Sequence, residues 1–282
     1  MTSTQPWTWK NSEERPFLTC DLLPVAHGFF TSPFYPHGPE ALVDVLTADS
    51  KKADSKISVH RVKQVHSADV LVPAEIAQAV SNGLPKLEDG SPAPFPLADG
   101  VVSDRPHQSV WACSADCTPA LIADVKTGQV AAVHAGWRGT AQKILPTAIL
   151  RLQEQGSQIA DLRVALGPAI AGTVYQVKRE VAAEVGVTVL PKNQGLSGDE
   201  VVDFLLTIDD SPLLDDPKEN RVRLDVRRIN QLQMVQVGLA LDQIAIAPHC
   251  TYQEPERFFS YRRTNEKKVQ WAGIISKYSP KT

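Results

Sequence analysis

Short apolar runs recur along the chain, separated by segments rich in glycine, proline and polar residues. Runs of this kind predict short strands. We expect strands at 26–31, 57–66, 109–113, 120–125, 130–134, 162–166, 241–247 and 269–276. Strands alternate with helical segments, and at least one pair forms a hairpin. The pattern therefore predicts an α/β fold with a mixed sheet.

Two longer segments, 140–155 and 225–236, have apolar residues at helical spacing. A shorter helix is predicted at 179–185, where Gly186 ends it. Pro146 interrupts the segment 140–155, so we expect its regular part to begin near Leu145. Asp225 is a favourable N-cap for the segment 225–236, and Gly238 is a natural stop for it. We expect all three to be helices.

A hairpin is predicted around Lys126–Gly128, which separates two apolar runs. Residues 121–125 and 130–134 should therefore be antiparallel neighbours. Cys117 lies before the first strand of this pair, and His134 ends the second. Both side chains should lie at the same end of the sheet.

The alternation of residues 57–66, ISVHRVKQVH, is typical of a strand and places His60, Gln64 and His66 on one face. The segment 193–219 is largely polar and acidic, and we expect it to be an insertion or a flexible loop. No repeat or linker divides the chain. We therefore predict one domain over residues 1–282, with residues 1–25 at its periphery.

Composition and charge exclude several classes of protein. Of the 282 residues, 43% are hydrophobic and 22% are charged, which is typical of an ordinary soluble globular protein. The net charge of −3 gives no basic excess for binding nucleic acid or an anionic membrane surface. No apolar run approaches the ~20 residues of a membrane span.

The N-terminus and the cysteine count favour a cytoplasmic protein. The first residues, MTSTQPWTWK, lack the basic and apolar regions of a signal peptide. Four cysteines in 282 residues are too sparse for a disulfide scaffold. In a reducing compartment, such cysteines are buried, bind a metal or react.

His66, Cys117 and His134 are candidate ligands for a metal ion. Imidazole and thiolate suit zinc or copper, and three protein ligands would leave a position open for catalysis. Two other interpretations remain: two core histidines with a buried thiol, or a Cys117 nucleophile with His134 as its base. The residues alone do not separate these alternatives.

Further polar side chains lie beside these candidates in the sequence. Asp116 directly precedes Cys117 and could serve as an acid, a base or an orienting group, or be a simple turn residue. Arg138, Arg262 and Arg263 lie among glycine or aromatic residues, as expected for binding phosphate or carboxylate. The alternative for these arginines is ordinary surface charge.

Six motifs together resemble the laccase-domain family, whose members are also called polyphenol oxidases or purine nucleoside phosphorylases. They are QVHS (64–67), ADGVVSD (98–104), ADCTPALIAD (115–124), VAAVHAGWRG (130–139), LGPAI (166–170) and CTYQEPERFFSYRR (250–263). The matches run in order across about residues 27–276. Six motifs in order are far more specific than any one of them.

The resemblance implies a single α/β domain with layered mixed sheets and helices packed outside. It also implies that His66, Cys117 and His134 bind a metal, zinc or alternatively copper.

The expected activities are phosphorolysis of adenosine, inosine and methylthioadenosine, and deamination of adenosine. We assign catalytic roles to Asp116, Cys117 and Arg138, and substrate binding to Gln64, Arg138 and Arg262. The partners are then a purine nucleoside and phosphate, the phosphate being held by Arg138 and a helix N-terminus near Thr140. No oligomeric state is assigned.

Three other functions remain open on the resemblance. Bacterial members are linked to amide hydrolysis in peptidoglycan precursors, and older names describe copper-dependent oxidation of phenols. One trio of ligands offers one metal, whereas four-electron reduction of oxygen generally needs several. A non-catalytic binding role is the last alternative. The chain also departs from the family pattern, because Ser32 follows Thr31 where the family usually has arginine.

Overall fold

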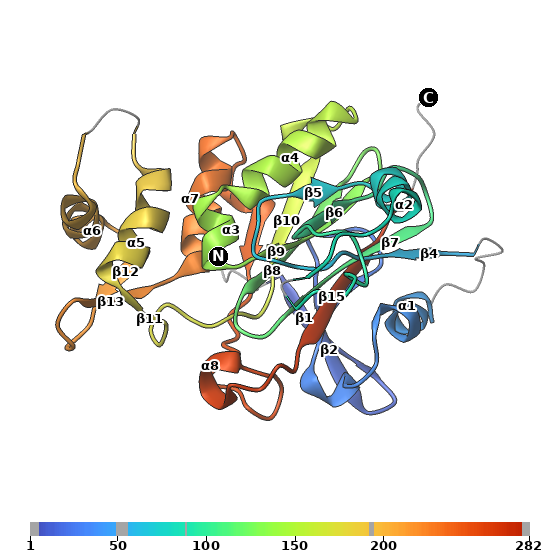
Figure 1. Ribbon diagram of the computed structural model, residues 1–282, viewed down its shortest axis with the longest axis horizontal. Helices are drawn as coiled ribbons and strands as arrows, with labels where there is room; N and C mark the ends of the chain where they lie inside the picture. Colours follow the sequence, from blue (N-terminus) through green and yellow to red (C-terminus); the bar gives the residue numbers. More distant parts are fainter. Residues whose placement is uncertain (1–5, 49–55, 88, 192–194, 278–282) are drawn as a thin grey trace.

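Two six-stranded sheets lie face to face, with helices on their outer sides (Figure 1). The computed structural model describes residues 6–48, 56–87, 89–191 and 195–277. Both sheets contain parallel and antiparallel pairs, and a third, smaller sheet lies to one side. The predicted α/β fold with layered mixed sheets and outer helices is therefore confirmed.

The first sheet has the strand order β1-β2-β3-β15-β7-β4. Its strands are β1 (Trp7–Ser12), β2 (Arg15–Cys20), β3 (His27–Phe30), β15 (Gln270–Ile275), β7 (Gln108–Ser114) and β4 (Ser58–His60). Neighbours are antiparallel except β4 and β7. Helix α1 (Pro39–Thr47) packs on its outer face through Leu42, Val43 and Leu46. The N-terminal segment supplies the edge strand β1 and the buried residues Leu18 and Cys20, while residues 1–5 of it lie outside the described residues.

The second sheet has the order β14-β10-β8-β9-β6-β5. Its strands are β14 (Ile244–Ile246), β10 (Leu162–Leu166), β8 (Thr118–Asp124), β9 (Val130–Ala135), β6 (Gly100–Val102) and β5 (Val70–Leu71). Helix α4 (Ile144–Glu154) covers its outer face through five buried apolar residues, and Met234 of α7 (Val226–Gln236) joins them. Every residue of β8 and β9 is buried, which explains their nearly continuous apolar sequences.

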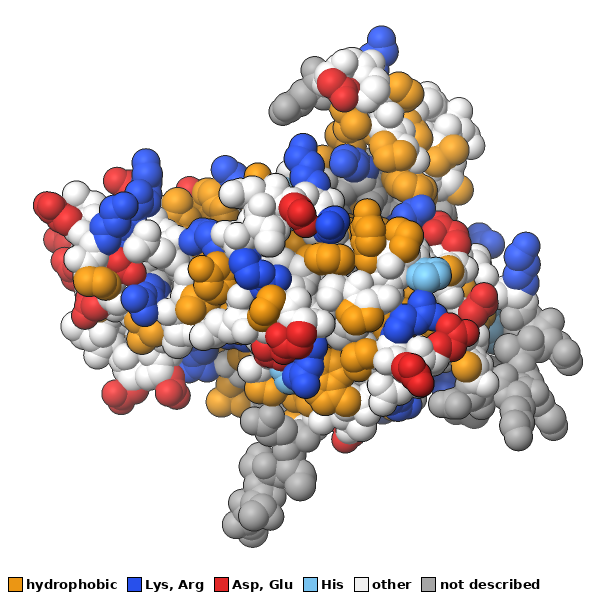
Figure 2. Space-filling model, turned by 90° about the horizontal axis from the view of Figure 1, so that it is seen from below, with side chains coloured by type: hydrophobic (Ala, Val, Ile, Leu, Met, Phe, Trp, Pro, Cys, Tyr) orange, Lys and Arg blue, Asp and Glu red, His pale blue; other side chains and the backbone are white. Residues whose placement is uncertain are grey.

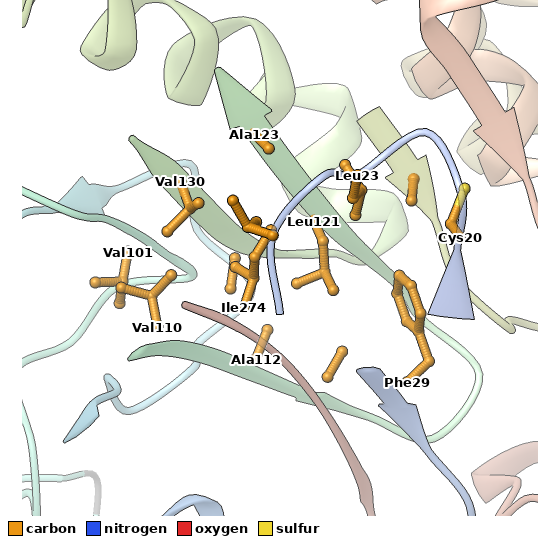
Figure 3. Packing of buried hydrophobic residues seen from close by; sticks show 14 of the residues in the cluster. Cys20, Leu23, Phe29, Val101, Val110, Ala112, Leu121, Ala123, Val130 and Ile274 are labelled. Atoms are coloured by element: carbon orange, nitrogen blue, oxygen red, sulfur yellow. The ribbon is translucent and has the colours of Figure 1, made fainter. Parts of the chain in front are cut away.

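The main hydrophobic core fills the space between the two large sheets (Figure 3). Leu121 and Val130 of the second sheet face Val110 and Ile274 of the first, and all four are fully buried. Burial of this many apolar side chains supplies the main driving force for folding. It also holds β8 and β9 rigidly, which positions the residues at their ends.

The third sheet, β11-β13-β12, forms a separate layer with two helices. Its elements are β11 (Gln176–Lys178), β13 (Arg221–Leu224), β12 (Leu213–Asp215), α5 (Arg179–Gly186) and α6 (Gly198–Thr207). The expectation of a flexible loop at 193–219 is wrong for residues 198–207 and 213–215, which form α6 and β12. Residues 193 and 194 lie outside the described residues. Ser197 and Glu200 form a capping box at the start of α6, and Val202 and Leu205 are buried against α5.

The remaining described helices include one of ten residues and several of three to five. They are α2 (Pro73–Asn82), α3 (Trp137–Ala141), α8 (Tyr261–Thr264), and 3₁₀ turns at Ser32–Phe34, Ile159–Asp161, Val187–Val189 and Leu241–Gln243. Across the part of the chain that the structure describes, none of the helices combines the length and apolar character required to cross a bilayer.

Three predicted elements differ in the structure. The strand predicted at 57–66 ends at His60, and residues 61–66 are irregular. In the segment 140–155, the prediction that the regular helix begins near Leu145 is confirmed, because α4 starts at Ile144. The residues before it differ, since 140 and 141 belong to α3 and Lys143 adopts a left-handed conformation with φ 62°. The strand predicted at 241–247 begins instead with a 3₁₀ turn, so β14 is only three residues long.

Candidate metal centre

The hairpin β8–β9 brings Cys117 and His134 together. Pro119 pairs with His134 and Thr118 with Ala135, so the residue just before β8 lies beside the end of β9. This confirms the hairpin prediction and its consequence that both side chains lie at one end of the sheet. His66 reaches the same place from the irregular segment after β4, with φ 63°. The possible ligand atoms of His66, Cys117 and His134 all lie within 4.8 Å of one another.

Gly136 leaves the space in which the three side chains meet. It follows β9 directly and is the N-cap of α3. A Cβ atom at this position would lie 3.0 Å from Cys117 Sγ, 3.1 Å from His66 Cδ2 and 3.6 Å from His134 Cε1. The glycine therefore lets a thiol and two imidazoles pack directly against the backbone. The donor set of one sulfur and two nitrogens, with ligand atoms within 4.8 Å of one another, fits a zinc or copper ion with three protein ligands.

Asp99 links two of the candidate ligands, and the sequence analysis did not assign it a role. Its Oδ1 accepts a hydrogen bond from His134 Nδ1 at 2.8 Å. Its Oδ2 accepts hydrogen bonds from the N–H groups of Val65 and Ser67, at 3.0 and 2.7 Å. One buried carboxylate thus orients His134 and also holds the backbone on both sides of His66. A carboxylate behind a ligating histidine is a common feature of metal sites.

The hydrogen bond to Asp99 also selects the ligand atom of His134. An ionised carboxylate only accepts hydrogen bonds, so Nδ1 of His134 carries the proton and Nε2 is left for a metal. Burial of Asp99 favours its neutral form. The hydrogen bond and charge of His134 and the N–H groups of Ser67 and Val65 outweigh burial, and they lower the pKa of Asp99.

The thiol of Cys117 ionises easily. Burial favours the neutral thiol, but the charge of His134 and hydrogen bonds from His134 and His66 outweigh burial and lower the Cys117 pKa to about 6. Burial likewise opposes the charged form of His134. The charge of Cys117 and the hydrogen bond to Asp99 overcome it and raise the His134 pKa to about 10. A thiolate is the form in which cysteine binds a metal or attacks an electrophile.

The three candidate ligands line a cavity of about 630 Å³, a volume in the range of small-molecule sites. Aromatic and cationic side chains make up much of its wall. The aromatic residues are Phe95, Tyr175, Tyr261 and Trp271, and the Lys and Arg residues are Arg61, Lys63, Arg262, Lys267 and Lys268. Such a wall suits a planar ligand that carries negative charge or is processed together with an anion.

Asp116 and Arg262 both lie in the cavity wall and contact each other. Asp116 Oδ1 accepts a hydrogen bond from Thr251 Oγ1 at 2.7 Å, and Oδ2 accepts one from the Arg262 N–H at 2.7 Å. The guanidinium of Arg262 lies over the ring of Tyr175, 4.9 Å from its centroid. Arg263 differs from Arg262 in its contacts. Its guanidinium donates hydrogen bonds to the backbone carbonyl groups of Thr251, Tyr252 and Phe258, and so stabilises the backbone of residues 251–258.

Other predicted residues are placed less directly. Gln64 lines the cavity, but its side-chain amide exchanges two hydrogen bonds of 2.8 Å with the backbone of Cys113. Arg138 is exposed, lies 4.3 Å from the ring centroid of Trp137, and is not among the described residues that line the cavity. Thr140 does not mark a helix N-terminus, because it lies inside α3 and is fully buried. His60 lines a different pocket from Gln64, so the predicted shared strand face is wrong.

The sequence matches one family over most of its length. Residues 45–277 match the family described as multi-copper polyphenol oxidoreductase laccase. The chain belongs to this laccase family. The resemblance stated from the six motifs is therefore confirmed.

Relatives within the laccase family carry several enzyme names. A purine nucleoside phosphorylase of Synechocystis sp. is 49% identical over 271 residues, which cover 96% of this chain and 97% of that protein. The adenosine deaminase RL5, from an unknown prokaryotic organism, is 27% identical over 71% of this chain and 68% of its own length. These names support an enzyme rather than a binding protein.

Solved structures show the same fold. YlmD of Geobacillus stearothermophilus superposes with a TM-score of 0.71 at 22% identity, over 97% of this chain and 100% of that one. The YfiH protein of Bacillus licheniformis gives 0.70 at 23% identity, over 95% and 99% of the two chains. The two-sheet architecture is thus shared with other proteins across nearly the whole chain.

Proposed function

We propose that this chain is a zinc-dependent purine nucleoside phosphorylase that acts on adenosine, inosine and methylthioadenosine, and that it also deaminates adenosine. The observation that carries the proposal is the convergence of His66, Cys117 and His134 in the wall of a cavity lined by aromatic and cationic residues. The relatives named purine nucleoside phosphorylase and adenosine deaminase support it, because both names describe enzymes that act on purine nucleosides.

The three residues would hold the metal through one sulfur and two nitrogen atoms. A zinc ion bound there supplies Lewis-acid chemistry and activates water, since three protein ligands leave a coordination position open. Copper is the alternative metal, because imidazole and thiolate bind it too. Because Asp99 accepts the hydrogen bond from Nδ1, Nε2 is the atom of His134 that would bind the metal, after losing the proton it shares with Cys117.

Phosphorolysis of adenosine breaks the bond between ribose C1′ and purine N9, and C1′ forms a new bond to a phosphate oxygen. The purine leaves with the bonding electrons and therefore needs a proton or a strong hydrogen-bond donor. Tyr175 lines the cavity and keeps its proton, because burial and the charge of Cys117 raise its pKa to about 12. We assign the Tyr175 hydroxyl as the donor to the leaving purine. Asp116 and Arg262 contact each other beside Tyr175, and the Arg262 guanidinium packs on the Tyr175 ring.

Deamination uses the same cavity with water in place of phosphate. Water attacks C6 of adenosine, ammonia leaves, and inosine is formed. The reaction consumes no phosphate, so the two activities can be separated by leaving phosphate out. Hydrolysis of an amide in a peptidoglycan precursor would use the same trio, and it remains the alternative if purine nucleosides are not substrates.

The test incubates the zinc-loaded full chain with adenosine, with and without phosphate, and follows products by chromatography. We expect adenine and ribose 1-phosphate only when phosphate is present, and inosine under both conditions. Cys117→Ala should reduce both products by at least about 100-fold, because it removes a metal ligand. Cys20→Ala removes a thiol from the core instead, and it should retain both activities. Absence of every purine product would contradict the proposal.

A further inference from the structure

The cavity wall carries an excess of positive charge that the chemistry at the candidate metal centre does not use. Five Lys or Arg side chains and two carboxylates line the cavity, although the net charge of the whole chain is −3. Figure 2 shows Lys and Arg side chains interspersed with hydrophobic ones on the face seen from below, the side on which α8 lies in Figure 1. A hollow lined by cations concentrates anionic ligands.

Arg61 is fixed in the wall by two aromatic rings. Its Cζ atom lies 4.5 Å from the ring centroid of Phe95 and 5.5 Å from that of Trp271. Its one ion pair among the described residues is with Glu40, whose side chain is 60% exposed. Its Nε atom is buried and has no hydrogen-bond partner in the described structure. The side chain as a whole remains 24% exposed, and a planar guanidinium held against two rings can present its terminal N–H groups to an anion such as phosphate.

Lys63 lies close to Arg61 in the same wall. Its N–H donates to the carbonyl of Pro96 at 2.9 Å, and its carbonyl accepts from Ala98 at 3.2 Å, so the backbone is held on both sides. Burial raises the pKa of Cys113 to about 12, and the charges of Arg61 and Lys63 oppose that rise. Both cations therefore act on one wall residue. Among the described carboxylates, Asp89 has a pKa that is lowered mainly by its own hydrogen bonds to Ser91, and the charge of Lys63 helps to lower it.

Lys268 is a further cation that lines this cavity. It precedes β15, the strand that carries Trp271. Its Nζ lies 3.1 Å from Glu266, but the two side chains are 42% and 55% exposed. An exposed pair of this kind contributes little free energy, so it does not prevent Lys268 from binding an anion.

We propose that Arg61, Lys63 and Lys268 form a phosphate-binding subsite of the cavity. The proposal rests on the proposed function, and it moves phosphate binding from Arg138 to residues that line the cavity. The group bound is either the inorganic phosphate consumed in phosphorolysis or a phosphate ester on the nucleoside. Arg61 and His66 are five residues apart, so their Cα atoms lie within about 18 Å even in a fully extended chain.

Binding of radiolabelled inorganic phosphate to the zinc-loaded full chain, measured by equilibrium dialysis at low ionic strength, tests the subsite. Lys63→Gln and Lys268→Gln should each raise the phosphate Kd about tenfold, or about 1.4 kcal/mol. Lys126→Gln is the control, because Lys126 is 74% exposed and lies at the β8–β9 turn, at the other end of β8 from Cys117. Circular dichroism and zinc content should be unchanged in all three variants.

Steady-state kinetics then distinguish the two sources of the phosphate group. A raised KM for phosphate with an unchanged KM for adenosine in Lys63→Gln assigns the subsite to inorganic phosphate. A raised KM for adenosine 5′-monophosphate with an unchanged KM for phosphate assigns it to a phosphate ester. Unchanged binding of both ligands in the Lys63→Gln, Lys268→Gln double variant would overturn the subsite.

The subsite and the proposed function fail in different ways. If the wild-type protein binds phosphate through Lys63 but forms no adenine, the subsite is supported and the proposed phosphorolysis is contradicted. Adenine formation that depends on phosphate would support phosphorolysis. If the KM for phosphate were the same in both lysine variants as in the wild type, that result would contradict the subsite. Equilibrium dialysis of the metal-free proteins should show the same loss of phosphate affinity in the lysine variants, because zinc is not part of the subsite.

Discussion

Asp99 connects His134 with the backbone around His66, and this connection depends on contacts that sequence spacing does not reveal. His66, Cys117 and His134 could be proposed from their chemistry and motifs. Asp99 also lies in one of those motifs, but an aspartate before a glycine is equally typical of a turn. Its role follows only when the backbone of residues 65–67 and the end of β9 meet at its carboxylate.

Asp99→Asn should weaken zinc binding about 10- to 100-fold, because the amide is a poorer acceptor for the His134 Nδ1–H and for the N–H groups beside His66. Competition with a chromophoric chelator measures the affinity. Asp44→Asn, at an exposed position of α1, is the control and should bind zinc like the wild type. Equal zinc affinity in Asp99→Asn and wild type would show that Asp99 does not support the ligands.

Cys117 should be the most reactive thiol of metal-free protein at neutral pH. Its pKa is lowered to about 6, so it is a thiolate above that pH, whereas burial raises the pKa of Cys113 to about 12 and of Cys20 to about 11. Iodoacetamide alkylation, followed by peptide mass spectrometry from pH 5 to 10, should show a midpoint for Cys117 near 6. A midpoint near the ordinary value of 9 would be inconsistent with the ion pair to His134.

At the level of elements, local patterns predicted the hairpin well and the segment before His66 poorly. The turn at Lys126–Gly128 and two apolar runs are sufficient to specify β8 and β9. Residues 57–66 alternate like a strand, but only β4 pairs with a neighbour, and His66 then adopts φ 63°. An alternation of apolar and polar residues indicates an extended chain, but it does not indicate whether a neighbouring strand is present to pair with it.

Gly136→Ala tests whether the space after β9 is needed for the metal. The backbone at Gly136 has φ −72° and ψ 167°, which alanine adopts readily, so the new methyl group acts mainly through its contacts with Cys117 and His66. We expect zinc affinity to fall at least about tenfold with little loss of secondary structure. Zinc titration and circular dichroism measure the two effects.

Gly198→Ala is the matched control for this change. A Cβ there would meet only Ala183 Cβ at 3.5 Å, an ordinary contact, in a helix remote from the trio in the sequence. It should leave zinc affinity unchanged. If Gly136→Ala also bound zinc normally, the close packing of Cys117 and His66 against Gly136 would not be needed for metal binding.

For the whole molecule, composition and periodicity were enough to predict the α/β class and the outer helices. The strand orders were not predictable, since β15 lies between β3 and β7 through contacts that join the two ends of the chain. The third sheet was missed because α6 exposes a polar face, and its buried residues become apparent only when α5 packs against it. Burial on one face of a short element is a weak sequence signal.

Helix α4 provides a test of the layered core. Leu152 is fully buried against the second sheet, whereas Leu150 on the same helix is 54% exposed. Leu152→Ala should lower the free energy of unfolding by about 3 kcal/mol through lost burial and a residual cavity. Leu150→Ala should change it by less than about 0.5 kcal/mol. Urea unfolding measures both values, and equal effects would contradict the observed packing of α4.

The most direct measurement concerns the binding of one metal ion by His66, Cys117 and His134 together. X-ray absorption at the zinc edge of the zinc-loaded full chain reports this ligand set. We predict one zinc per chain, with one sulfur at about 2.3 Å and two imidazole nitrogens at about 2.0 Å. The sulfur contribution should disappear in Cys117→Ala. A zinc environment without sulfur, or an identical spectrum in Cys117→Ala, would contradict the account.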